Sequence, residues 1–268
     1  MSGARSNTVS AKEALAPRRP WTTAELLMLS LWFAMALFCL AVPIPAHTRF
    51  VLGLPVAAGA LPILRHFHAI RNGDRRREEL RMALIVSVGF IAFGAIEGYF
   101  WNLVTRLTPT TFDVQLARWD MGVAPAVRVF AKAHWWLSRS LDFLYDPALW
   151  IACMAAVGLS DGQLRRRLLI SLPLGGLLVI PCYLLFPAVG PIHVGDPQAT
   201  RNCMPSMHLT WALLLAINSK GWSRWILGSL AALTAVATLS TGEHYYPDLV
   251  AALPWTWFLM FLTKKIVG

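Results

Sequence analysis

The sequence has few charged residues and no polar stretch long enough to form an appended soluble domain. Only 14% of its 268 residues are charged, whereas 56% are hydrophobic and lie largely in long runs. Soluble domains carry about 25% charged residues, so this composition excludes a soluble globular domain. The sequence instead predicts an all-α polytopic bundle whose solvent is lipid.

Cysteine is also scarce. Cys39, Cys153 and Cys182 fall within apolar runs, while Cys203 lies on a loop without an evident partner. The sequence therefore predicts neither a disulfide framework nor a paired-cysteine metal site. Acidic residues are fewer than basic ones, and the net charge is +10. Such a charge can indicate nucleic-acid binding, but its distribution along the chain favours a membrane explanation without a nucleic-acid partner.

Apolar runs near the length of a membrane span recur along the chain. A helix needs about 20 mostly apolar residues to cross the hydrocarbon core, and eight runs approach that length. The second is the weakest, because Pro55 and Pro62 interrupt it. The predicted spans are residues 25–46, 50–64, 82–104, 140–159, 168–187, 205–219, 223–241 and 248–263.

The basic residues favour eight spans over seven. With eight, 17 of the 24 Lys and Arg residues fall on one side of the membrane. This side is cytoplasmic, because Lys and Arg concentrate in cytoplasmic loops. Without the second span, the basic segment 65–81 would lie opposite the basic N-terminal tail. We therefore predict a cytoplasmic tail over 1–24, one transmembrane domain over 25–268, and two cytoplasmic termini.

Residues 112–139 mix charged and aromatic side chains between the third and fourth predicted spans. This pattern is typical of an amphipathic segment at the membrane interface. The segment is either a structural helix at the headgroup level or a lid that recognises the polar head of a substrate. In the second interpretation, Asp113 and Asp120 are candidates for headgroup binding.

Two polar clusters stand at the entries of predicted spans. Residues 201–208 precede the sixth span and residues 240–248 precede the eighth. The sixth span leaves the first cluster and the seventh returns to the second, so both clusters lie on one membrane face. That face is opposite the basic loops, which makes the predicted site extracytoplasmic.

Both clusters suit the binding of a phosphate-like anion. Pro205 and Pro247 favour the first helical position, and free amides at helix starts bind anions. Arg201 adds a fixed cation with bidentate donors. His244 and Asp248 are four residues apart, a spacing that lets the carboxylate hold one imidazole tautomer and leave the other nitrogen free to attack.

His208 can complete the chemistry from the facing helix. It could protonate the departing oxygen and later deprotonate the incoming water or alcohol. A site at the ends of spans can accept a headgroup while acyl or prenyl chains stay in the bilayer. The sequence therefore predicts phosphoryl transfer from a membrane lipid phosphate to water or to an alcohol acceptor.

These motifs resemble those of the type 2 phosphatidic acid phosphatase superfamily of lipid phosphatases and phosphotransferases. One helix of that family carries Pro-Ser-x-His and a later helix carries Gly-x-His-x-x-x-Asp. The matching residues here are Pro205, Ser206 and His208, and then Gly242, His244 and Asp248. Residues 241–245 and 112–120 are also similar to the branch of inositol phosphorylceramide synthase and its bacterial relatives.

The resemblance implies a fold, a chemistry and a location. It implies a six-helix phosphatase-like core over about 82–264, a phosphohistidine intermediate, no metal or other cofactor, and a bacterial cytoplasmic membrane. Ser206 would bind a phosphoryl oxygen and His208 would be the acid and base. His244 would be the nucleophile and Asp248 its partner.

The chain departs from the family pattern where the phosphate should bind. Thr238 stands where the family usually has an arginine, six residues before the nucleophile, and the first family motif is not recognisable. We predict that Arg201 replaces the missing cation. His193, in the loop where the first motif would end, is a second phosphate-binding candidate, and Glu243 is a third headgroup candidate.

Two alternatives of other classes stay open. The chain could be a non-catalytic carrier of lipids or small anions that uses Arg201 and the helix starts for binding. It could also be a metal-dependent membrane hydrolase with His208, His244 and Asp248 as ligands, because two histidines and a carboxylate are a common metal-binding set.

Overall fold

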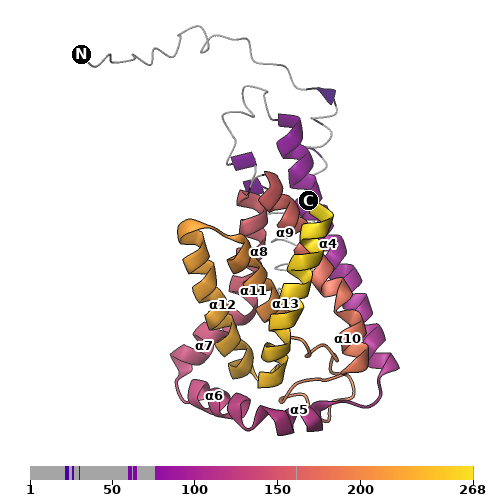
Figure 1. Ribbon diagram of the computed structural model, residues 1–268, viewed down its shortest axis with the longest axis vertical. Coiled ribbons are helices and arrows are strands. Elements are labelled where there is room, and N and C mark those ends of the chain that lie inside the picture. The colour runs from indigo at the N-terminus through magenta and orange to yellow at the C-terminus, as the bar shows by residue number, and fades with distance from the viewer. Residues whose placement is uncertain are drawn as a thin grey trace, which may run out of the picture.

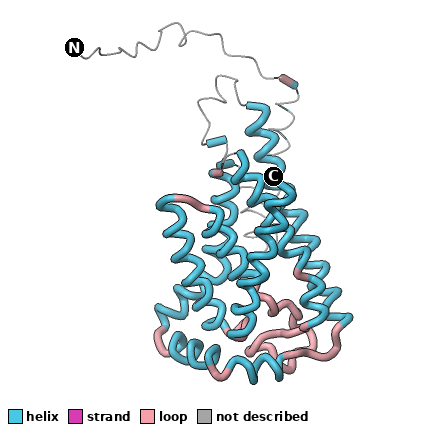
Figure 2. The backbone as a smooth tube through the Cα atoms, in the orientation of Figure 1, coloured by secondary structure: helices cyan, strands magenta, loops and turns pink. Residues whose placement is uncertain are grey.

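A computed structural model describes residues 76–160 and 162–267, together with isolated positions at 22, 23, 26, 30, 60, 61, 63 and 64. Every element in this part of the chain is helical (Figures 1 and 2). The helices are α4 Arg76–Leu107, α5 Asp113–Asp120, α6 Val123–Lys132, α7 Trp135–Phe143, the π-helical turn η2 Leu144–Ala148, α8 Leu149–Leu159, α9 Gly162–Leu178, α10 Ile180–Leu185, α11 Met207–Asn218, α12 Gly221–Thr241 and α13 Tyr246–Val267.

Five helical stretches in the described residues are long and apolar enough to cross a membrane, so the chain is an integral membrane protein. They are Arg77–Leu107, Trp135–Leu159, Gln163–Leu185, Gly221–Thr241 and Tyr246–Val267. These helices contain most of the predicted third, fourth, fifth, seventh and eighth spans. The predicted tail 1–24 and the first two spans lie almost wholly outside the described residues, so the structure does not establish eight spans.

The predicted sixth span is shorter than expected. Helix α11 has 12 residues, about 18 Å of helix, so a sixth span would have to include residues on either side of it. It is apolar because it lies inside the bundle and packs against α8, α9, α12 and α13. Trp211 fixes it there, since its buried indole N–H donates to the carbonyl of Leu172 on α9. The apolar run thus reflects burial in protein.

The chain alternates direction, which brings distant segments to one end of the bundle. Helix α10 ends near the start of the 186–206 loop, α11 leaves that end, and α12 returns to it (Figure 1). The loop before α13 therefore lies beside the loop before α11, as the sequence predicts. Helices α5 and α6 cross the same end, whereas the turn between α11 and α12 and the end of α13 lie at the other (Figure 1).

Helices α5 and α6 lie within the segment 112–139, for which the sequence predicts an interfacial location. On α6, Ala124 and Ala131 are buried while Val129 and Phe130 are exposed. Helix α6 packs against α12, and α5 packs against the start of α13. This segment therefore covers the end of the bundle at which the two motif-bearing loops meet.

Candidate active site

The loop before α13 depends on a glycine. Helix α12 ends at Gly242, whose φ of 82° lies in the left-handed region. A methyl group there would lie 2.6 Å from Cγ2 of Ile192. Both conformation and space therefore require glycine, and the turn it allows presents residues 243–245 to the interior.

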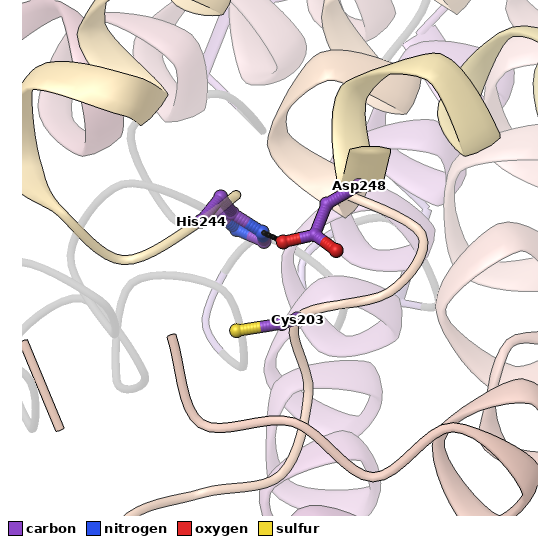
Figure 3. Close-up of side chains that lie close together, drawn as sticks. All are labelled: Cys203, His244 and Asp248. Carbon is purple, nitrogen blue, oxygen red and sulfur yellow. Dashed lines mark hydrogen bonds and ion pairs between the residues drawn. The ribbon is translucent and has the colours of Figure 1, made fainter. Parts of the chain in front are cut away.

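His244 and Asp248 form the predicted pair. Nδ1 of His244 lies 3.3 Å from Oδ2 of Asp248 (Figure 3). The same oxygen accepts the backbone N–H of Tyr245 at 2.8 Å. His244 is 4% exposed and Asp248 is fully buried. The carboxylate is thus fixed by its own helix start, and Nε2 is the imidazole nitrogen that remains for reaction.

Ser206 joins the two helix starts. Its hydroxyl caps α11 by accepting the N–H of Leu209 at 3.5 Å, and its own N–H donates to the carbonyl of Asp248 at 3.1 Å. Pro205 precedes the cap instead of occupying the first helical position, whereas Pro247 lies in the first turn of α13. The hydroxyl of Ser206 therefore has a structural partner.

His208 faces His244 from α11. The two ring centroids are 6.1 Å apart with the planes at 71°. The His208 ring stacks on Tyr145 at 4.0 Å, and its Nε2 lies 3.9 Å from Oδ1 of Asp146. Tyr145 and Asp146 lie on η2, whose π-helical turn contains Pro147. π-Helical turns often mark functional sites, so this proline within an apolar span was a signal that the sequence analysis did not use.

A cavity of about 390 Å³ connects these groups. His208, His244, Glu243 and Cys203 line it together with apolar side chains such as Trp211. This volume lies within the range of about 300–1,000 Å³ that is usual for small-molecule sites. The cavity is therefore large enough for a small-molecule ligand, and both imidazoles line it.

Cys203 adds a thiol beside the pair (Figure 3). Its Sγ donates to the carbonyl of Glu243 at 2.9 Å. Burial raises the pKa of this thiol well above its usual value, and the charges of Asp248 and other carboxylates raise it further. Ligand atoms of Cys203, His244 and Asp248 lie within 4.8 Å of one another and could hold a metal ion. Metals bind the thiolate, so an ion at this position would have to displace the thiol proton.

Two of the three predicted phosphate ligands, Arg201 and His193, have other contacts. Nη1 of Arg201 donates to the carbonyls of Ala199 at 2.9 Å and Pro197 at 3.4 Å within its own loop. Its buried Nε has no hydrogen-bond partner among the described residues. His193 places Nε2 3.0 Å from Oε2 of Glu243. Neither residue is among those that line the cavity.

Asp113 and Asp120 are buried and hold the backbone. Asp113 accepts the N–H groups of Val189 and Gly190 at 3.1 to 3.3 Å. Asp120 accepts the N–H of Tyr246 at 2.7 Å and that of Ala124 at 3.0 Å. Neither residue is among those that line the cavity. These contacts indicate that the two aspartates position the site loops.

Arg128 is a cation that the sequence analysis did not single out. It lies on α6, and its guanidinium would be 3.2 Å from a methyl group at Gly242. Thr238, at the position of the missing family arginine, is buried and donates its hydroxyl to the carbonyl of Thr234 at 2.6 Å. Arg128 therefore brings positive charge to the loop that carries His244 from a different helix.

The bundle, the histidine–aspartate pair and the second histidine define a membrane-embedded protein with a candidate phosphoryl-transfer site. A family profile of the PAP2 superfamily matches residues 116–262, more than half of the chain, and the chain belongs to that superfamily. The match gives no support to the narrower branch of inositol phosphorylceramide synthase. Comparisons with curated proteins and with solved structures found no match.

Proposed function

We propose that the chain is a lipid phosphate phosphohydrolase or headgroup phosphotransferase that acts through a phosphohistidine, without a metal. The observation that carries the proposal is the buried His244–Asp248 pair, which faces His208 across one cavity. A carboxylate-held histidine opposite a second histidine supplies a nucleophile and an acid–base group at one site. Membership of the PAP2 superfamily supports this class of reaction.

The reaction would proceed in two steps. First, Nε2 of His244 attacks phosphorus, the phosphorus–oxygen ester bond breaks, and protonated His208 gives its proton to the departing oxygen. Asp248 stabilises the positive charge that develops on the imidazole. In the second step His208 takes a proton from water or an alcohol, that oxygen attacks phosphorus, and the phosphorus–nitrogen bond breaks to restore His244.

Several groups are available to bind the phosphoryl oxygens. The N-terminal end of α11, which begins after Ser206, would attract an anion through the helix dipole. Arg201 remains the predicted cation, with His193 as a second candidate, and Arg128 is a third from α6. Glu243, which lines the cavity, remains a headgroup candidate.

Substitution of the two arginines would identify the phosphate-binding cation. Arg201→Ala should raise KM and lower kcat if its guanidinium contacts both the bound phosphate and the more charged transition state. Arg128→Ala is the comparison on a different helix. Unchanged kinetics in Arg201→Ala together with a loss in Arg128→Ala would transfer the role to Arg128.

The proposed site is extracytoplasmic in a bacterial cytoplasmic membrane, with eight spans and cytoplasmic termini. The 17 Lys and Arg residues on one side support this orientation. In intact cells, Gln198→Cys should react with an impermeant thiol reagent above the wild-type background, and Ser223→Cys should not. The reverse labelling would place the site on the cytoplasmic face.

Phosphate release from lipids tests the function itself. Purified protein would receive a lipid extract, with and without an added alcohol, and with and without a chelator. We expect inorganic phosphate or an exchanged headgroup in both chelator arms. Loss of activity with the chelator would favour a metal-dependent hydrolase, and binding without any turnover would favour a carrier.

A further inference from the structure

The cavity contains a buried carboxylate that the proposed reaction does not use. Glu97 lies on α4, is 3% exposed and lines the same cavity as the two histidines. Its Oε1 has no hydrogen-bond partner among the described residues. An unpaired carboxylate within an apolar span is costly, and such residues usually serve binding or transport.

The neighbouring helix leaves space for this side chain. Gly176 of α9 faces Glu97 so closely that a methyl group there would lie 2.6 Å from Oε1. It would also lie 2.6 Å from Cζ of Phe93. A glycine at this helix contact therefore accommodates the carboxylate, and Glu97 is built into the packing of α4 against α9.

The acidic side chains that line the cavity favour a ligand that carries a cation. Among the described residues, the carboxylates of Glu97, Asp146 and Glu243 line it, and no Lys or Arg does. An ammonium group beside Glu97 would favour the ionised carboxylate, which a ligand with only negative charge would not do. A ligand that also carries a cation would be attracted to these carboxylates while its phosphate stays near the histidines.

Aromatic rings accompany the carboxylate. Trp101 is four residues after Glu97, on the same side of α4, and also lines the cavity. Trp150 and Tyr145 line it from the next span. Ammonium groups bind to the faces of such rings, and quaternary ammonium ligands are recognised in this way most often. The acidic and aromatic residues of the cavity therefore suit a substituted ammonium group.

We propose that Glu97, with Trp101 and Trp150, binds the ammonium group of a phosphoester whose phosphate lies at His244. The ligand class is a zwitterionic headgroup of the choline or ethanolamine type. This inference rests on the proposed function for the position of the phosphate. The recognition of the cation is a binding property that can be measured without turnover.

The test compares phosphocholine with 3,3-dimethylbutyl phosphate, which replaces the ammonium nitrogen by carbon and has nearly the same shape. Binding is measured by isothermal titration to the full-length His244→Ala protein in detergent, so that neither probe is consumed. We expect phosphocholine to bind about tenfold more tightly or better, the size of a desolvated cation–π and carboxylate contact. Glu97→Gln in this background should remove the difference by weakening phosphocholine alone.

Glu78→Gln is the matched control, because Glu78 is an exposed carboxylate at the far end of α4 and does not line the cavity. It should leave both affinities unchanged. Equal affinities for the two soluble probes would restrict recognition of the cation to lipid ligands, which the second pair of probes tests. Equal weakening of both probes by Glu97→Gln would overturn the proposal, because it would show a structural role. A preference for phosphocholine that Glu97→Gln leaves unchanged would also overturn it.

A second pair of probes identifies the source of the headgroup. Phosphatidylcholine and phosphatidylglycerol in detergent micelles are lipids with and without an ammonium group in the headgroup. A Glu97-dependent preference with the lipids alone assigns the site to a lipid headgroup, and a preference with the free phosphoesters extends it to soluble ligands. A preference with neither pair overturns the inference. Failure of the proposed function would differ, because cation-selective binding would persist without phosphate release.

Discussion

The two sides of the cavity hold their histidines by different means. His244 is buried and is held by hydrogen bonds, since Asp248 contacts its ring and also accepts the N–H of Tyr245. His208 is held by a stacked ring and by the more distant Asp146, whose side chain is 51% exposed. A nucleophile needs one fixed direction of attack, whereas an acid–base group must exchange its proton with solvent. The difference in packing therefore matches the difference in the proposed roles.

The largest effect should come from His244, which is the more rigidly held of the two histidines. His244→Ala should lower turnover by roughly 10⁴-fold or more and abolish acid-labile phosphate incorporation from a labelled lipid, because no covalent intermediate can form. His134→Ala, which removes an exposed imidazole at the end of α6, is the control and should keep wild-type activity. Appreciable activity in a folded, monodisperse His244→Ala protein would show that the phosphohistidine mechanism is wrong.

Asp248→Asn should cause the next largest loss, roughly 10³-fold in kcat. The amide keeps the shape of the carboxylate but holds the imidazole less well and does not stabilise its positive charge. The phosphohistidine should still form, more slowly, and be detectable by rapid acid quench. If Asp248→Asn had full activity, the fixed orientation of His244 would have to come from another group.

The effect of removing His208, which is held less tightly, should depend on the leaving group of the substrate. His208→Ala should lower turnover of alkyl phosphates by about 10²- to 10⁴-fold, because the departing oxygen loses its proton donor. The nitrophenolate of a nitrophenyl phosphate leaves without being protonated. The rate at which this substrate phosphorylates His244 in a single turnover should therefore fall much less. Equal losses with both substrates would mean that His208 acts in binding or packing instead.

The smallest effect should come from Asp146. Its Oδ1 is 3.9 Å from His208 and largely solvated, so Asp146→Asn should lower kcat only a few-fold. The same exchange at Asp248 is the internal comparison, and the ratio of the two losses measures how differently the two sides are built. A loss at Asp146 as large as that at Asp248 would remove the distinction between a rigid and an open side.

Much of the arrangement follows from the sequence. Long apolar runs require helices, because backbone groups in lipid must be paired within one segment. The four-residue spacing places His244, in the loop just before α13, within reach of Asp248 in the first turn of that helix. Alternating spans bring Ser206 and Asp248 to one face. These features depend on local geometry and on the direction of the chain, which the sequence determines directly.

Other features depend on contacts between helices and were not evident from the sequence. The apolar run of α11 indicated a span, but the sequence did not show how short the helix is or which helices surround it. Asp113 and Asp120 suggested headgroup ligands, yet the fold directs their carboxylates to the backbone of other segments. Glu97 lines the same cavity as the histidines because α4 packs against α8 and α9. A side chain's partners across the bundle are set by helix packing, to which each helix contributes only one face.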